Sequence, residues 1–330
     1  MQSGETKKSV DRRNLIILIA AFAAVYVIWG STYLAIKYAI ETLPTFLMAG
    51  FRFAIAGSIL YGIARLSPNY ETPKLIHWRT SLIVGTLLLG IGNGGVVVAE
   101  HYISSSLAAL LVATMPFWMV IFGWAFMGSG RPGFKVAAGL LIGFAGVWLL
   151  IGGVGPSGNG QLYGVIGVTI ATIGWSIGSL YGTRAPTTES TVLAAGMQML
   201  AGGAVLLITG TVMGEWTGLD IAAVSTNSWL ALGYLIVFGA VGAYTAYSWL
   251  LKNVSPSMIS TYAYVNPVIA VFLGWMIAGE SLTGQMLIGA AIIVGSVMLI
   301  KTEKKSINDA DEEKVSGTSK VTGEFQTSST

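Results

Sequence analysis

The stretch LIILIAAFAAVYVIWGSTYLAIKYAI, from Leu15 to Ile40, contains one charged residue, Lys37. A helix needs about 20 apolar residues to cross a bilayer core of roughly 30 Å, so the stretch is long enough to span a membrane. Its apolar run is interrupted at residues 29–33, WGSTY, by small and polar side chains. The stretch therefore predicts a membrane helix that carries hydrogen-bonding groups at membrane depth.

The composition of the whole chain agrees with this prediction. Of the 330 residues, 54% are hydrophobic and only 10% are charged, whereas about a quarter of a soluble domain is charged. The chain has no cysteine and two histidines, so we expect no disulfide framework, no metal site and no cofactor. Its basic residues are dispersed through short loops instead of forming one patch, which argues against a nucleic-acid partner.

Ten apolar runs are long enough to be membrane spans. They cover 15–38, 44–66, 78–99, 104–127, 134–151, 162–182, 192–213, 229–250, 257–278 and 284–300. Backbone groups in hydrocarbon have to satisfy their own hydrogen bonds, and these runs are too long for barrel strands, so all ten are predicted to be helices. The first run follows basic residues and could be a cleaved signal peptide, but its apolar stretch continues past the small-residue site at 21–23, which favours a retained helix.

The positions of the basic residues predict the orientation of these helices. If the N-terminus lies inside, 16 of the 18 lysines and arginines fall in inside segments, as the positive-inside rule expects. Glu41, Glu100, Glu215, Asp220 and Glu280 then fall in outside loops. We therefore expect both termini to be cytoplasmic, with a short segment at 1–14 and a disordered polar tail at 302–330.

An internal repeat relates the two halves of the chain. At an offset of 146 residues Trp29 falls on Trp175, residues 49–50 on 195–196, and Gly57 on Gly203; at an offset of 151 Pro116 falls on Pro267. Five helices per copy is an odd number, so the second copy has to enter the membrane from the opposite side. Inverted repeats are typical of secondary transporters that work by alternating access, and a duplicated scaffold or channel is the alternative.

The motifs in both halves resemble the EamA-type branch of the drug/metabolite transporter superfamily, and the details are most similar to its drug/metabolite-exporter subgroup. The resemblance is carried by residues 29–32, WGST, 48–53, MAGFRF, 105–116, SSLAALLVATMP, 264–275, YVNPVIAVFLGW, 279–282, GESL, and the glycine-rich helix 289–295. It covers nearly the whole chain. One departure is that Gly279-Glu280 becomes Gly128-Ser129 in the first copy, so the glutamate cannot have one role in both halves.

This resemblance implies an all-α integral membrane protein with ten transmembrane helices. They would form two inverted five-helix EamA repeats, at 15–151 and 162–301, around a central cavity. The resemblance also implies export of small metabolites, amino acids or related amphiphiles across the cell membrane. Neither the substrate nor the oligomeric state follows from it.

Arg52 is the first candidate for a substrate contact. It lies about 12 Å into its helix at 1.5 Å per residue, and a charge at that depth needs a wet cavity or a partner. An anion site and a structural arginine are both open interpretations. Its counterpart in the second copy is Gln198, so an anion site would be one-sided.

Glu100 and His101 are the candidates for proton coupling. They are the one acidic and histidine pair next to a membrane helix, and they could pair with Lys37 or Arg52. A solvated outer loop is the alternative. Lys37 lies near the outer end of its helix, where its long stem could reach the interface, which makes it a weaker candidate than Arg52.

Other residues are expected to line the cavity or to shape the helices. The cavity candidates are Trp29, Ser31, Thr32, Tyr33, Trp118, Trp175, Tyr262, Tyr264 and Asn266, although membrane aromatics also serve as packing or interface anchors. Pro116 and Pro267 are expected to kink their helices at matched mid-helix positions, freeing one carbonyl each.

These observations predict a secondary exporter of small organic solutes in the membrane. An uncoupled facilitator is the alternative. We expect no enzyme, because no convergent set of catalytic residues is present, and no ATP-binding loop suggests a pump.

Overall fold

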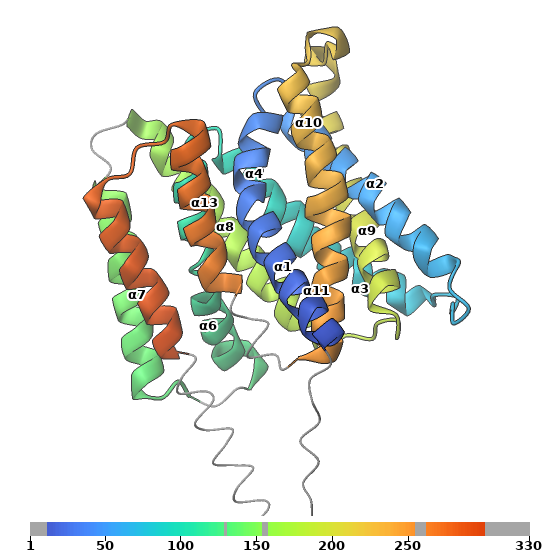
Figure 1. Cartoon of the computed structure of the whole chain (residues 1–330), viewed down its shortest axis with the longest axis horizontal. Coiled ribbons are helices and arrows are strands. Elements are labelled where there is room, and N and C mark those ends of the chain that lie inside the picture. Colours follow the sequence, from blue (N-terminus) through green and yellow to red (C-terminus); the bar gives the residue numbers. More distant parts are fainter. Residues whose placement is uncertain (1–11, 129–130, 154–157, 255–261, 301–330) are drawn as a thin grey trace, which may run out of the picture. The chain divides into compact units, whose positions relative to one another are not determined.

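The computed structural model describes residues 12–128, 131–153, 158–254 and 262–300 (Figure 1). Within these ranges the chain is helical and contains no strand. The helices are α1 (Arg12–Ala39), α2 (Thr45–Arg65), α3 (Leu75–Gly85), η1 (Thr86–Asn93), α4 (Gly94–Ala99), α5 (Ser105–Val112), α6 (Met115–Met127), α7 (Phe134–Gly153), α8 (Gly158–Gly182), α9 (Thr191–Val212), η2 (Glu215–Gly218), η3 (Ile221–Ala223), α10 (Thr226–Tyr234), η4 (Leu235–Gly242), α11 (Ala243–Asn253), α13 (Tyr262–Ala278) and a last helix, Gly284–Ile300.

Seven of the predicted spans are long and apolar enough to cross a membrane. They are Leu15–Ala39, Thr45–Arg65, Leu75–Ala99, Ser105–Met127, Gly160–Gly182, Thr191–Val212 and Thr226–Tyr247. Three shorter apolar helices, Phe134–Leu149, Val265–Ala278 and Gly284–Ile300, lie within the other predicted runs. The prediction of an all-helical membrane protein is thus confirmed.

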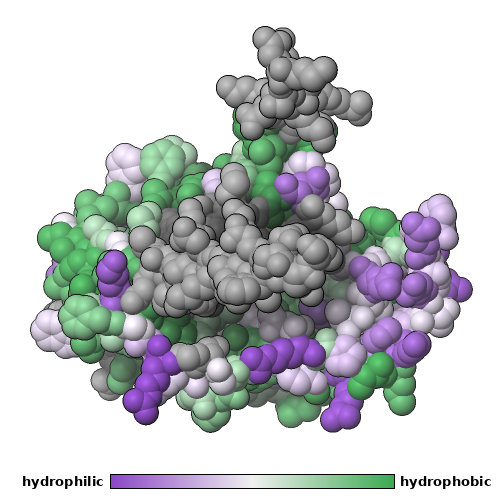
Figure 2. All heavy atoms as spheres, turned by 90° about the horizontal axis from the view of Figure 1, so that it is seen from below, coloured by the Kyte–Doolittle hydropathy of each residue, from purple (hydrophilic) through white to green (hydrophobic). Residues whose placement is uncertain are grey.

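Many large apolar side chains are exposed to the surroundings, as they are in a helix that faces lipid. Ile19 is 60% exposed, Ile208 62% and Leu141 73%. On the face that Figure 2 shows, hydrophobic residues reach the surface between hydrophilic ones. An apolar surface of this extent is not tolerated in water, so it indicates contact with a bilayer.

The described residues form two compact units, one from the segments up to residue 115 and from 158 to 282, and one from the segments between 116 and 153 and from 283 to 300. In the first unit α1 packs against α10, α11 and α13, and α2 packs against α9. In the second unit the glycines of α7 face the last helix: a Cβ on Gly139 would lie 2.7 Å from Ile300, and one on Gly146 would lie 2.8 Å from Ile292. These units differ from the two sequence repeats.

The crossing of α2 and α9 depends on four glycines that let the backbones touch. A Cβ on Gly57 would lie 2.9 Å from the carbonyl oxygen of Gly196, and a Cβ on Gly203 would lie 3.1 Å from that of Gly50. The first distance is shorter than real Cβ atoms show, and a Cβ on Gly203 would also lie 2.8 Å from the backbone nitrogen of Ala54, so a side chain at either position would force the helices apart. The repeat relates Gly50 to Gly196 and Gly57 to Gly203, so the two contacts are equivalent under exchange of the halves.

Two spans contain a π-helical segment that the sequence did not predict. η1 lies between α3 and α4, and η4 lies between α10 and α11. These are the third and eighth predicted spans, which the repeat places in corresponding positions. A π-helix widens the backbone and often occurs at functional sites.

Candidate functional site

Arg52 is buried in the first unit, at 4% exposure. One of its terminal nitrogens donates to Asn93 Oδ1 at 3.5 Å, and its guanidinium carbon lies 4.7 Å from the centre of the Phe53 ring. Its Nε has no hydrogen-bond partner in the described part of the chain. A buried N–H group without a partner destabilises the folded protein by about 1–3 kcal/mol. An acceptor that reached this nitrogen would remove that cost.

Glu100 follows the last residue of α4 and is also buried, at 5% exposure. Neither carboxylate oxygen finds a hydrogen-bond partner among the described residues. Burial raises the pKa of Glu100 well above its ordinary value, the charge of Glu280 raises it further, and Lys37 and Arg52 oppose these effects only in part. The interpretation of Glu100 as part of a solvated loop is therefore wrong, and burial makes its protonated form easier to reach than that of a carboxyl in water.

His101 follows Glu100 directly in the sequence, but its surroundings are different. It is exposed, and its Nε2 lies 2.7 Å from Thr45 Oγ1. Burial of part of the ring lowers the pKa of His101, and Glu215 opposes that effect. The two residues thus do not form one buried acid and histidine pair.

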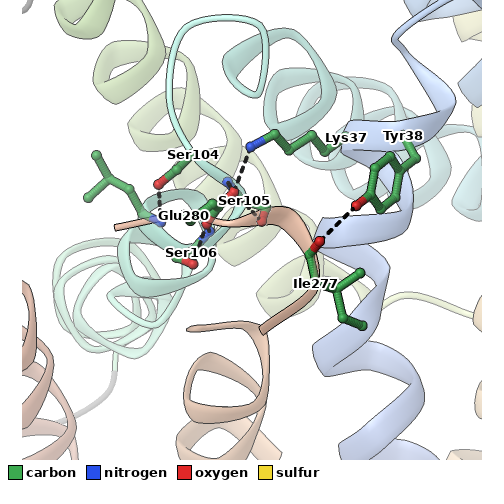
Figure 3. Close-up of polar contacts among 8 residues, drawn as sticks. Lys37, Tyr38, Ser104, Ser105, Ser106, Ile277 and Glu280 are labelled. Atoms are coloured by element: carbon green, nitrogen blue, oxygen red, sulfur yellow. Dashed lines mark hydrogen bonds and ion pairs between the residues drawn. The ribbon is translucent and has the colours of Figure 1, made fainter. Parts of the chain in front are cut away.

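Lys37 pairs with Glu280, and not with Glu100 as the sequence suggested. The Lys37 Nζ lies 2.8 Å from Glu280 Oε1 (Figure 3). The same carboxylate accepts from Ser105 N at 3.0 Å, Ser105 Oγ at 2.8 Å, Ser106 N at 3.1 Å and Ser106 Oγ. Glu280 thereby joins the last turn of α1 to the N-terminus of α5, whose orphan N–H groups favour an anion.

The electrostatics of Glu280 reflect this set of donors. Burial raises the pKa of Glu280, but the hydrogen bonds from Lys37, Ser106 and Ser105 outweigh it and lower that pKa from 4.5 to about 2. Gly279, at φ +64°, ends α13 and turns the chain so that Glu280 N donates to Gly274 O at 3.0 Å. Glycine adopts this left-handed conformation without strain.

Three predicted aromatic and amide candidates join α1 to α11 and α13. The Trp29 ring lies 5.2 Å from the rings of Tyr247 and Tyr262, and its Nε1 donates to Gly239 O at 3.2 Å. Asn266 is buried, and with its amide nitrogen facing two carbonyls it donates to Tyr262 O and Tyr26 O at 3.2 and 3.3 Å. Asn266 therefore holds α1 and α13 together in this conformation.

The hydroxyls of the polar step on α1 find partners inside the protein. Ser31 Oγ donates to Ile28 O at 2.8 Å and lies 2.6 Å from the Tyr234 hydroxyl. Thr32 Oγ1 donates to Trp29 O at 2.6 Å. Tyr33 is close enough to Glu100 and Tyr262 to interact with both electrostatically, so it is the member of the step that lies near the Glu100 carboxyl.

The remaining candidates are spread over other places. Trp175 packs against η1, where its Cε3 would lie 2.9 Å from a Cβ on Gly92. Trp118 belongs to the second unit, where it stacks on Phe122 and lies 5.8 Å from Phe144. The side chain of Tyr264 lies outside the described residues.

Both prolines lie within apolar helical segments, but the helix around Pro116 is interrupted. Pro267 lies inside α13, as predicted. Pro116 lies near the middle of the span Ser105–Met127, where it is the second residue of α6 and follows a turn at residues 113–114 that separates α5 from α6. Proline is tolerated in the first helical turn because its missing N–H has no partner in any case.

Four residues of this arrangement were missed or undervalued by the sequence analysis. Asn93 and Gly239 lie on the two π-helical segments, and each contacts a predicted candidate. Lys37 and Glu280 form an ion pair across 243 positions. Lys37 and Arg52 are the two basic residues of the 18 that do not fall in predicted inside segments. Their position in membrane helices was the signal that could have pointed to carboxylate partners.

The charged cluster formed by Lys37, Arg52, Glu100 and Glu280 contains the chemical groups that proton exchange and anion binding require. Glu100 can hold or release a proton without breaking a hydrogen bond, and Arg52 can offer a free donor to a carboxylate or phosphate. Among the described residues, no group of three or more His, Cys, Asp and Glu side chains is arranged to hold a metal ion.

Comparisons with known proteins agree with this fold. Residues 15–152 and 162–302 each match the EamA-like transporter family. The chain is 39% identical over 293 residues to the uncharacterized inner membrane transporter YedA of Escherichia coli (strain K12), covering 88% of this chain and 93% of that protein. It is 27% identical over 307 residues to the uncharacterized transporter YvbV of Bacillus subtilis (strain 168), covering 91% and 95%.

A more distant relative has a named substrate, and a solved structure has a similar fold. The S-adenosylmethionine/S-adenosylhomocysteine transporter of Chlamydia trachomatis (serovar L2) is 24% identical over 313 residues, covering 90% of this chain and 91% of that protein. A crystal structure with 22% sequence identity superposes with a TM-score of 0.60, covering 89% of this chain and 99% of that chain. With two family matches across nearly the whole length, the chain belongs to the EamA-like transporter family.

Proposed function

We propose that this protein is a secondary active transporter that exports small organic metabolites by alternating access, with proton coupling through Glu100. The solutes of this class include amino acids and amphiphilic metabolites or drugs. The family and the membrane helices support transport, and the buried, unpaired Glu100 carboxyl is the observation that supports coupling to protons.

The proposed architecture is ten transmembrane helices in two inverted repeats around a central cavity, with both termini cytoplasmic. The family matches at 15–152 and 162–302 support the two repeats. The reciprocal glycine contacts between α2 and α9 support them further, because an inverted repeat related by a two-fold axis brings equivalent residues together in pairs.

Glu100 is suited to carry the proton because its protonation changes the net charge of a buried cluster. In the protonated form the carboxyl is neutral, and burial stabilises that form. In the ionised form it would attract Arg52 electrostatically, and the Nε of Arg52, which has no hydrogen-bond partner among the described residues, could bind a second anion. A solute with an anionic group would accept a hydrogen bond from the Arg52 guanidinium. It would compete with ionised Glu100 for the positive charge of Arg52, so binding of the solute would favour protonation of Glu100.

The test is uptake into proteoliposomes of solutes first identified by comparing the metabolites of overexpressing and deletion cells. The proposal expects wild-type protein to concentrate a solute when a pH gradient is imposed, and Glu100→Gln protein to equilibrate it without concentrating it. If uptake by wild-type protein changes neither with a pH gradient nor with a protonophore, the protein is the uncoupled facilitator instead. Absence of any solute movement would refute transport of small solutes.

A further inference from the structure

The ion pair of Lys37 and Glu280 is placed to hold three segments of the first unit together. Lys37 lies in the last turn of α1, Glu280 follows α13, and the serines that bind Glu280 begin α5 (Figure 3). The Glu280 side chain is 6% exposed and that of Lys37 is 33% exposed. The contact is therefore a largely buried junction with one member that water can reach.

The junction is closely packed around the Glu280 carboxylate. A Cβ on Gly274 of α13 would collide with Ser106 Oγ and with Glu280 Oε2. Five donor contacts from Lys37, Ser105 and Ser106 converge on the two carboxylate oxygens. Because the donors come from α1 and α5, separation of these helices from the end of α13 requires the carboxylate to lose them.

Glu100 is the group whose charge acts on this junction. The groups that interact with it electrostatically are Glu280, after α13, Lys37 and Tyr33 on α1, and Arg52 on α2. On its own segment the next residue is the exposed His101. Helix α8, which also packs against α4, carries no charged residue.

We propose that Lys37 and Glu280 are positioning residues for transport, forming a latch that keeps the ends of α1 and α13 on α5 while Glu100 is protonated and that opens when Glu100 ionises. When Glu100 is neutral, Glu280 is the carboxylate that holds Lys37. When Glu100 is ionised, it attracts Lys37 and repels Glu280, and both effects weaken the pair. The inference rests on the proposed proton-coupled transport, and it names the contact through which the proton would act on the helices.

The test is a distance measurement between two spin labels on the full chain in lipid nanodiscs. The chain contains no cysteine, so Glu41→Cys and Leu282→Cys provide the two attachment sites, both exposed. At pH 5 the wild-type background is expected to give one short distance, and at pH 9 an additional longer one. Glu100→Gln, which mimics the protonated carboxyl, is expected to keep the short distance at both pH values.

Variants of the latch give the opposite result. Lys37→Met is expected to show the longer distance at both pH values, and Lys37→Arg, which keeps the charge, to restore the wild-type response. The exposed Glu71, changed to Gln, is the matched control for loss of a carboxylate and should leave the response unchanged. The latch is refuted if the wild-type distances do not respond to pH, if Glu100→Gln responds as the wild type does, or if Lys37→Met keeps the short distance.

Uptake assays separate failure of the latch from failure of the proposed function. If wild-type protein moves no solute under a pH gradient while the distances behave as expected, the transport proposal fails, and the latch stands only as a pH-dependent contact between the helices, without a role in transport. If wild-type uptake is driven by protons but the distances do not depend on pH, the latch fails and the transport proposal stands.

Discussion

Replacing Glu280 by Gln should destabilise the folded protein, and the size of the effect can be worked out from the contacts of the carboxylate. Its pKa falls from 4.5 to about 2 on folding. At about 1.4 kcal/mol per tenfold change in the ionisation constant, this difference gives roughly 3.5 kcal/mol. Lys37 is 33% exposed, so water screens part of the attraction, and we expect a loss of about 2 kcal/mol.

The pH dependence of this loss has a defined sign. A carboxyl whose pKa is lowered on folding contributes stability above its unfolded pKa, near 4.5, and that contribution disappears as the pH falls through the folded value, about 2. The difference in unfolding free energy between wild-type and Glu280→Gln protein should therefore be full at pH 7 and smaller at pH 3.

Chemical denaturation in mixed detergent micelles, followed by tryptophan fluorescence, measures this difference. The exposed Glu71, changed to Gln, is the control and should stay within about 0.5 kcal/mol of the wild type. The reasoning is refuted if Glu280→Gln unfolds within that same margin at pH 7, or if its deficit at pH 3 equals its deficit at pH 7.

Four further substitutions, the first with a matched control, test the packing and the charged cluster. Gly57→Leu should lower the unfolding free energy by about 1–3 kcal/mol, because the side chain would overlap the α9 backbone, whereas Gly62→Leu on the same helix meets no atom within 4 Å and should be nearly neutral in a denaturation experiment. Glu100→Gln should make solute uptake independent of external pH, and a retained pH response would contradict its role. Arg52→Gln, which copies the second repeat, should lower uptake of anionic solutes roughly tenfold or more, as loss of a charged hydrogen bond predicts; unchanged uptake would remove Arg52 from the site. His101→Ala should keep uptake within about twofold, since the ring is exposed, and a larger loss would restore His101 as a coupling residue.

The sequence predicted the helices well because hydrophobic length is a local property. The starts and ends of α2 and α9 lie within one or two residues of the predicted runs 44–66 and 192–213. The π-helical segments η1 and η4 were not predicted, since their residues are as apolar as those of an ordinary membrane helix. The kink predicted at Pro116 lies close to the turn at residues 113–114 between α5 and α6, and the sequence did not predict that turn.

The candidate site was predicted in part. Arg52 and Glu100 were recognisable because a charge in or beside a membrane helix is rare, and the structure buries both. Their surroundings were not predictable, because the partner of Lys37 is separated from it by 243 residues. The predicted spans and the positions of the basic residues assigned Glu280 to an outside loop. The structure adds that the chain turns at Gly279, so that the Glu280 carboxylate contacts the N-terminus of α5.

The carboxylates that cap two early helices have a consequence for the order in which the protein is made. Glu215 accepts hydrogen bonds from the N–H groups of Phe46 and Leu47 at the start of α2, and Glu280 accepts those of Ser105 and Ser106 at the start of α5. A ribosome completes both helices long before it reaches either glutamate. During insertion the N–H groups of Phe46 and Leu47 and those of Ser105 and Ser106 therefore lack these glutamate acceptors, although Ser104 Oγ, which is already present, accepts from Leu107 N and caps α5 in part. An N-terminal half synthesised alone would keep these four N–H groups without the two glutamates until a separately supplied C-terminal half docked on it.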